Sequence, residues 1–272
     1  MTRAAWLIAL AACADPTPSS LLDGPRVLAI VADPPVVAPG VRTALLPITT
    51  LDGQPAAPDS VAWRACAPWA VVADPERDCT DGALALATEP GGGTTLSLDL
   101  LGGAVPTAGT APADRGDCAP PAMALTLVAE IQLAGQRLLA KKQLAVGPAV
   151  DRQNPVIEQI LLDGAPAAEG AALPAGATVQ LGARIAATSI DDVCGVAEPE
   201  RETVRVVVYP GRGAVASDDA FEITERDGQL VEGSVELTLP ATEQRVPLWL
   251  VAVDETGGAA ARFVDLASTE SK

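Results

Sequence analysis

Alternating hydrophobic and polar residues predict β-strands along most of this chain. In the clearest run the apolar side chains share one face: Met123, Leu125, Leu127, Ala129 and Ile131. A repeat of two residues is that of a half-buried strand, and no convincing amphipathic helix accompanies it. Further runs, bounded by Gly, Pro and Asp, predict strands at residues 26–32, 42–49, 61–66, 96–100, 137–146, 156–162, 179–185, 203–209, 235–239, 247–253 and 259–266. The fold class predicted from this pattern is all-β.

The order of these signals occurs twice. An apolar run ending at Asp33-Pro34 has its counterpart in a run ending at Asp163-Gly164, and Pro39-Gly40 has its counterpart in Pro174-Ala175-Gly176. A repeat at this scale indicates two copies of one fold. We therefore expect two modules and a Pro-containing linker. The expected boundaries are residues 26–147 for module 1, 148–155 for the linker, 156–268 for module 2 and 269–272 for a tail.

Two local patterns resemble immunoglobulin-like proteins. Trp63 lies near Cys66 on a middle strand, although the two residues differ in parity and would face opposite sides of the sheet. The turn Asp254-Glu255-Thr256-Gly257-Gly258 follows a Val-rich penultimate strand, which resembles the last hairpin of bacterial immunoglobulin-like, PKD-like and fibronectin type III modules. The resemblance implies two tandem β-sandwiches with a general role in binding or spacing. The parity of Trp63 and Cys66 argues against the usual disulfide between the two sheets.

The N-terminus carries a short apolar run that begins after Arg3 and ends in Leu10-Ala11-Ala12-Cys13. This arrangement resembles the signal peptide and lipobox of a bacterial lipoprotein. The resemblance implies that residues 1–12 are removed and that Cys13 is lipidated. The polar residues that follow predict a flexible tether over residues 13–25.

The resemblance to lipoproteins also implies a location. Several acyl chains on one cysteine hold a protein firmly to a bilayer, so we expect membrane attachment through Cys13. Position 14 is Ala14, whereas an Asp there is associated with inner-membrane retention in Gram-negative lipoproteins. We therefore expect a lipid-anchored protein of the cell envelope, on the outer membrane of a Gram-negative bacterium.

Four cysteines remain once Cys13 is lipidated, an even number that suits an oxidising compartment. Three pairings are open. The favoured one joins the nearest pair, Cys66 and Cys79, and leaves Cys118 with Cys194.

Charge and composition exclude several functions. After loss of residues 1–12 the net charge is 17 − 35 = −18, which repels phosphate backbones and argues against nucleic-acid binding. The chain has no histidine, which rules out imidazole-based acid–base chemistry and imidazole metal ligands. No cofactor and no small-molecule substrate is inferred.

Acidic and aromatic residues supply the remaining candidate sites. Solvated turns are the default interpretation of the acid pairs, and calcium is the functional alternative because hard oxygen ligands between modules suit it. The calcium candidates are Asp191, Asp192, Asp254 and Glu255. The candidates for contact with a protein or glycan partner are Trp69, Tyr209 and Trp249, of which Trp249 is expected to reach the surface because it alternates with Leu248 and Leu250.

These observations predict a non-catalytic, lipid-anchored envelope protein that acts as a binding, adhesion or spacer module. The alternative is an accessory subunit of an envelope export or polysaccharide assembly. A carboxylate-dependent hydrolase is the more remote alternative, because adjacent acids in a turn seldom face each other across a cleft.

Overall fold

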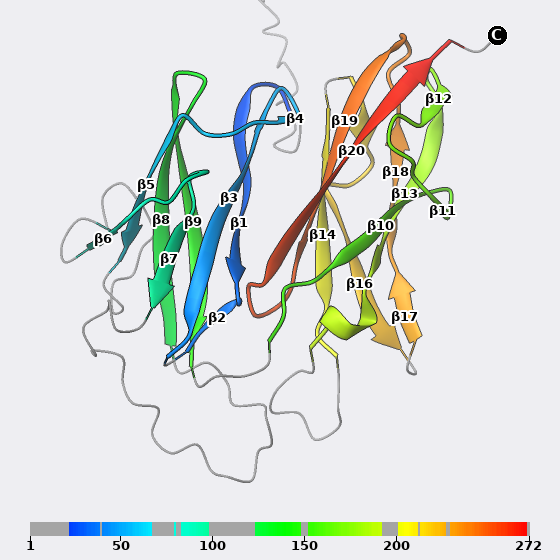
Figure 1. Ribbon diagram of the computed structural model, residues 1–272. Coiled ribbons are helices and arrows are strands. Elements are labelled where there is room, and N and C mark those ends of the chain that lie inside the picture. The colour runs from blue at the N-terminus through cyan, green and yellow to red at the C-terminus, as the bar shows by residue number, and fades with distance from the viewer. Residues whose placement is uncertain are drawn as a thin grey trace, which may run out of the picture.

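The computed structural model describes residues 22–38, 40–66, 79, 83–97, 123–147, 152–191, 201–211, 213–226 and 229–270. Nearly all of its regular structure is β (Figure 1), with a short 3₁₀ turn, η2, at Ala187–Ser189. Across these ranges no helix has both the length and the apolar character needed to cross a bilayer.

Module 1 consists of two sheets that face each other. The first contains β1 (Pro25–Asp33), β3 (Arg42–Leu51), β4 (Gln54–Pro55) and β7 (Thr94–Ser97), with β3 pairing both β1 and β7. The second has the order β2-β9-β8-β5-β6 and contains β2 (Val36–Val37), β9 (Gln136–Val146), β8 (Met123–Leu133), β5 (Ser60–Ala65) and β6 (Leu84–Leu86).

Module 2 is built in the same way. Its first sheet has the order β11-β10-β13-β18-β15, from β11 (Ala165–Pro166), β10 (Ile157–Leu162), β13 (Thr178–Ile185), β18 (Ser234–Thr238) and β15 (Val215–Ala216). Its second sheet has the order β12-β20-β19-β14-β16-β17, from β12 (Ala172–Pro174), β20 (Ala259–Thr269), β19 (Gln244–Val253), β14 (Val204–Pro210), β16 (Ala220–Arg226) and β17 (Gln229–Glu232).

The pairings of the two modules correspond strand for strand. The order β1-β3-β7 in module 1 matches β10-β13-β18 in module 2, and β2-β9-β8-β5-β6 matches β12-β20-β19-β14-β16. Each module also has one short parallel pair, β2 with β9 and β12 with β20, beside otherwise antiparallel ladders. Two copies of an immunoglobulin-like sandwich are therefore present, as the repeat in the sequence predicted.

Each sandwich encloses its own apolar core. Odd-numbered residues of β8 from Leu125 to Leu133 face the core of module 1 around the fully buried Trp63, and even-numbered residues of β19 from Val246 to Ala252 face the core of module 2. Trp63 also donates its indole N–H to Gly92 O at 2.9 Å, which satisfies its polar atom inside the core. These faces are the ones that the period-two pattern predicted.

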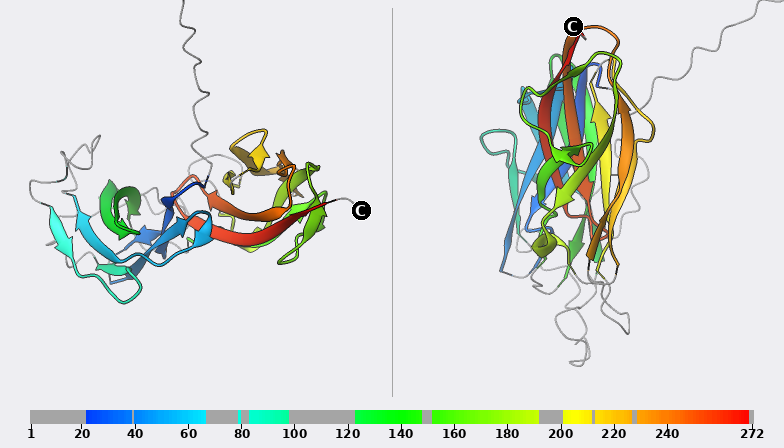
Figure 2. Two further views of the ribbon diagram at one scale, coloured as in Figure 1. Left: turned by 90° about the horizontal axis from the view of Figure 1, so that it is seen from above. Right: turned by 90° about the vertical axis from the view of Figure 1, so that its right-hand side faces the viewer.

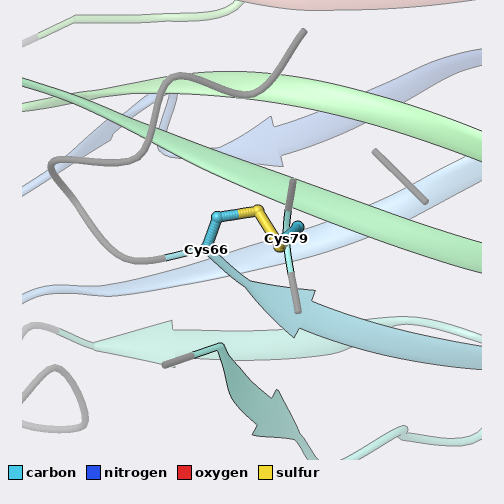
Figure 3. The surroundings of a disulfide bond; sticks show 2 residues. All are labelled: Cys66 and Cys79. Carbon is cyan, nitrogen blue, oxygen red and sulfur yellow. A yellow bond between two sulfur atoms is a disulfide. The ribbon is translucent and has the colours of Figure 1, made fainter. Parts of the chain in front are cut away.

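Cys66 and Cys79 form a disulfide bond, as predicted (Figure 3). The bond lies on the outer face of its sheet, where the two cysteines form a small apolar cluster with Val128 and Leu139. Cys66 thus faces away from Trp63, in agreement with their opposite parity. Cys118 and Cys194, the second expected pair, lie outside the described residues.

The strands that sequence patterns did not predict are two to four residues long, apart from β16. Strands such as β2, β4 and β12 hold too few residues to show an alternation, and only pairing with a longer neighbour defines them. At the C-terminus β20 continues to Thr269, so the expected tail begins one residue later than predicted.

The two sandwiches lie side by side, with β1 of module 1 beside β20 of module 2 (Figure 1). Viewed from the side, their long axes run in nearly the same direction (Figure 2). Segment 148–155 was predicted to be a linker, and the part of it that the structure describes carries no regular structure. The modules nevertheless share an extensive contact, which positions the candidate site.

We expect replacement of both Cys66 and Cys79 by Ser to lower the free energy of unfolding of module 1. The bond closes a loop with a sequence separation of 13 residues, which corresponds to about 3 kcal/mol in the chain-entropy model. Denaturant unfolding followed by circular dichroism measures the change, with the reduced wild-type protein as a control. An unchanged midpoint would contradict a stabilising role for this bond.

Candidate functional site

The contact between the modules is an apolar seam. It joins one edge of module 1 to the outer face of the β14–β19–β20 sheet of module 2. A β-bulge in β1, between Val27 and Ala29, turns two consecutive residues, Leu28 and Ala29, away from the core of module 1 and towards module 2. The seam is defined by Leu22, Leu28, Ala29, Ile48, Tyr209, Trp249, Val251, Val253, Ala261 and Phe263.

Trp249 lies at the centre of the seam. Its side chain alternates with Leu248 and Leu250 as predicted, but the residue is only 7% exposed, so the expectation that it reaches the surface is wrong. The physical reason is that module 1 covers this face of the sheet. The indole N–H donates to Gly53 O of module 1 at 2.7 Å, and the ring lies 5.1 Å from that of Phe263. Trp249 therefore joins the two modules.

The seam also holds the first described residue of the chain. Leu22 is 1% exposed, and its N–H donates to Pro210 O of module 2 at 3.2 Å. It forms an isolated parallel bridge with Gly211. The prediction of a flexible tether is therefore wrong at Leu22, because this residue is buried in the seam and bonded to module 2.

Polar contacts connect the modules at one end of the seam. Asn154 in the linker donates to Ala32 O of module 1 at 2.7 Å, and its side-chain oxygen accepts from Ala259 N of module 2 at 2.9 Å. Lys142 of module 1 donates to Gly257 O in the β19–β20 turn. Burial lowers the pKa of Lys142, and the nearby carboxylate of Asp254 opposes this shift. The linker is thus bonded to both modules.

A groove of about 400 Å³ opens beside the seam. Its walls come from the start of β1, from β9 and from β14, so both modules contribute. Tyr209 is half-buried here, and burial raises its pKa. The groove is lined by Pro25, Arg26, Val27, Leu28, Leu138, Leu139, Val207, Tyr209 and Asp219. Of the three predicted contact residues, Tyr209 lines this groove, Trp249 lies in the seam, and Trp69 lies outside the described residues.

Asp254, one of the calcium candidates, builds the β19–β20 turn. Its Oδ1 accepts from Thr256 N and Oγ1, both at 2.9 Å, and from Gly258 N at 2.7 Å. Glu255 lies beside it, and its carboxylate accepts from Thr203 N at 3.3 Å. Asp254 and Glu255 also line a second groove of about 320 Å³ together with Thr203, Arg205, Glu222 and Val253.

Asp191, a further calcium candidate, contacts Glu202 and Arg152. Its N–H donates to Glu202 Oε1 at 3.1 Å, and Arg152 lies 3.8 Å from its carboxylate. Asp192 lies outside the described residues. In the part of the chain that the structure describes, no three Cys, Asp or Glu residues are grouped so that they could hold a metal ion.

Glu202, which the sequence analysis did not single out, has a strongly raised pKa. It is 2% exposed, and the Arg152 guanidinium lies 3.7 Å from its Oε2. Burial, followed by the charge of Asp254, raises the pKa of Glu202 to about 7, and a hydrogen bond from the Asp191 backbone opposes the shift. The buried charge cluster consists of Glu202 with Arg152, Asp191 and Asp254. Its charge changes near neutral pH because Glu202 gains or loses a proton there.

Comparisons with known proteins concern the fold. No protein-family model matches the chain, and no match is found among curated proteins. Three similar solved structures are a chimeric titin Z1Z2 (14% identity, TM-score 0.24, 92% of this chain and 99% of that chain), the fibronectin(III)-like modules of Clostridium thermocellum CbhA (14%, 0.24, 89% and 95%) and the tandem Ig repeats of Dlar (12%, 0.26, 92% and 100%). These likenesses carry no argument about function.

The seam contains a glycine whose role the sequence only partly indicates. Gly53 is the second residue of a tight turn after Asp52, with φ +83°, which the sequence pattern identifies as a turn. The sequence does not show that Pro247 of module 2 lies against Gly53. A Cβ at Gly53 would lie 2.5 Å from Pro247 Cγ. Gly53 is therefore needed both for the turn and for close approach of the modules.

We expect Gly53→Ala to destabilise the protein more than Gly135→Ala. Both glycines occupy the second position of a two-residue turn with positive φ, which costs about 1 kcal/mol for alanine. At Gly135 an added Cβ meets nothing within 4 Å, whereas at Gly53 it meets Pro247 across the seam. Urea unfolding measures both variants. Equal losses would show that the seam tolerates the added carbon.

We expect Glu202→Gln to stabilise the protein above pH 7 and to change little near pH 4. The folded-state pKa of about 7 lies above the ordinary value of 4.5, so folding binds a proton between these values and stability falls as pH rises through them. A neutral amide removes this dependence, with a difference on the order of 3 kcal/mol at pH 8. Thermal unfolding from pH 4 to pH 9 measures it. A parallel pH profile in both proteins would contradict the assignment.

Proposed function

We propose that this protein is a non-catalytic, lipid-anchored component of the bacterial cell envelope that offers its two-module body to a binding partner. The observation that carries the proposal is the chain's start: a lipobox-like Leu10-Ala11-Ala12-Cys13, followed nine residues later by Leu22 buried in the seam. The anchor and the ordered body are therefore close together in the chain.

The length of the tether limits where the body would lie. The nine Cα–Cα steps from Cys13 to Leu22 span at most about 30 Å when the chain is fully extended. Because Leu22 contacts both the Gly53 turn of module 1 and Pro210 of module 2, a single attachment would hold both modules. Ala14 after the lipidated residue supports the outer membrane as the location.

The fold supports a role in binding or spacing. Both modules are immunoglobulin-like sandwiches, and the side-by-side packing presents them as one body with a groove between them. Loops and grooves carried by a rigid scaffold are common contact surfaces. The expected partner is a protein or glycan, and adhesion is one form that such binding takes.

We expect Cys13→Ser to release the protein from membranes, because the diacylglyceryl group needs the Cys13 thiol. Fractionation of envelopes followed by immunoblotting measures the release, and intact-mass analysis of the wild type should show an acylated chain beginning at Cys13. The matched control replaces Cys66 and Cys79 by Ser, which removes two other sulfur atoms and should leave the protein on the membrane. A Cys13→Ser variant that still sediments with membranes would refute the anchor.

An accessory subunit of an export or polysaccharide assembly, unlike an independent binding module, needs a stoichiometric partner in the envelope. Chemical crosslinking of intact cells, followed by purification of this chain, distinguishes the two functions by whether one partner is recovered at constant ratio.

A further inference from the structure

Polar contacts, not apolar side chains, hold one end of the contact between the modules. Asn154 of the linker donates to Ala32 O of module 1 and accepts from Ala259 N of module 2. Lys142 on β9 donates to Gly257 O in the β19–β20 turn. The linker and both modules therefore meet here through a few hydrogen bonds, which water replaces more easily than it replaces the apolar contacts of the seam.

Two buried carboxylates lie beside these contacts. Glu202 is 2% exposed and Asp254 is 6% exposed. Among the described residues, Glu202 Oε2 and Asp254 Oδ2 have no hydrogen-bond partner. A Cβ added at Gly258 would meet both Asp254 Oδ2 and Asn154 Oδ1, so this carboxylate lies against the linker contact. Burial of a charged oxygen without a hydrogen bond is unfavourable, and hydration removes that penalty.

The described charges of this cluster balance when Glu202 is protonated. Arg152 Nη1 lies 3.7 Å from Glu202 Oε2 and 3.8 Å from Asp191 Oδ2. With a neutral Glu202, the cations Arg152 and Lys142 offset Asp191 and Asp254, whereas an ionised Glu202 adds one buried negative charge. The charged groups around Glu202 come from four elements: Arg152 of the linker, Asp191 after η2, Asp254 and the exposed Glu255 of the β19–β20 turn, and Lys142 of β9.

The pKa of Glu202 agrees with this charge balance. Burial raises it to about 7, and the charge of Asp254 adds to the shift. The chain has no histidine, the side chain that ordinarily titrates near neutral pH. A conformation that hydrates Glu202 returns its pKa towards the ordinary 4.5, so such a conformation becomes about tenfold more favourable with each pH unit from 4.5 to 7 and gains no more above that.

We propose that ionisation of Glu202 opens the contact between the modules at its Asn154 end, while the apolar seam continues to hold the modules together. Asn154 and Lys142 then leave the β19–β20 turn, and water reaches the carboxylates of Glu202 and Asp254. The two modules form a rigid body in acid and a hinged one from neutral pH upwards. This inference goes beyond the proposed function, because it concerns how the modules move and requires neither an anchor nor a partner.

Hydrogen exchange of single amides, followed by NMR, measures the opening. The sample is the full chain in its Cys13→Ser form, with EDTA so that no metal ion contributes. Ala259 N–H reports on the Asn154 end, because its acceptor is Asn154 Oδ1. After correction for the pH dependence of intrinsic exchange, we expect the protection of Ala259 to fall about a hundredfold from pH 5 to pH 8.

Dilute urea distinguishes local opening from global unfolding. Local opening exposes little surface, so the exchange of Ala259 should be independent of dilute urea at both pH values. Leu22 N–H reports on another part of the contact, because it donates to Pro210 O. We expect no urea-independent change at Leu22 between pH 5 and pH 8, since the apolar seam stays closed.

Paired variants assign the response to Glu202. Glu202→Gln keeps the side chain neutral, so the protection of Ala259 at pH 8 should stay at its pH 5 level. The matched control, Glu222→Gln, replaces an exposed acid on β16 and should retain the hundredfold change. Lys142→Met removes the cation that module 1 supplies and should speed exchange of Ala259 at both pH values without abolishing the response. Circular dichroism confirms that each variant is folded.

Each of three results would overturn the proposal. Equal protection of Ala259 at pH 5 and pH 8 would show that this end of the contact stays closed. A loss of protection that persists in Glu202→Gln would assign the titration to another group. A loss that depends on dilute urea would show that a module unfolds as a whole and that the contact does not open by itself.

Discussion

The arrangement of this protein depends on the burial of one sheet face between its two modules. The outer face of the β14–β19–β20 sheet carries Trp249, Val251 and Phe263, which an isolated module would expose to water. Burying an aromatic or large aliphatic side chain contributes about 1.5 to 3 kcal/mol. A few such residues outweigh the freedom of an eight-residue linker, so the two sandwiches form one body with a defined geometry.

Hydrogen bonds make that geometry specific. Apolar contact alone would allow the modules to slide, but the indole of Trp249 finds its acceptor only at Gly53 O, and Asn154 bonds both modules at the end of the seam. Gly53 and Pro247 approach so closely that a single added carbon would separate them. Shape, hydrogen bonding and the absence of a side chain at one position together determine how the modules meet.

The groove beside the seam follows from the same packing. Module 2 covers the edge of module 1 at β1, while β9 pairs with β8 along its length and with β2 only at Ala145 and Val146. The groove between β9 and β14 exists only because the modules lie side by side. Leu22 lies in the seam nine positions after Cys13, so the proposed attachment at Cys13 would hold this groove near a membrane surface.

Much of the local structure was readable from the sequence. Period-two runs predicted the long strands, the repeated order predicted two modules, and the spacing of Cys66 and Cys79 favoured their disulfide. Opposite parity correctly predicted that Trp63 and Cys66 face opposite sides of their sheet, because the direction of a side chain in a strand depends only on position along it. The acidic turn at Asp254 was visible too, although not its function as the acceptor for three donors.

Tertiary structure decided what covers each outer face. Parity predicted that Trp249 lies on the outer face of its sandwich. Only the neighbouring module determines whether that face is exposed to water or buried in the seam. For the same reason Leu22, Asn154 and Glu202 carry no signal in the sequence: their partners lie far away in the chain. The sequence by itself determined strands, turns and the two sandwich cores, which arise from short-range alternation and chain reversal. The angle between the modules and the groove arise from contacts over more than a hundred residues, which no local pattern records. The buried charge cluster joins Arg152, Asp191, Glu202 and Asp254, which come from separate loops and strand ends.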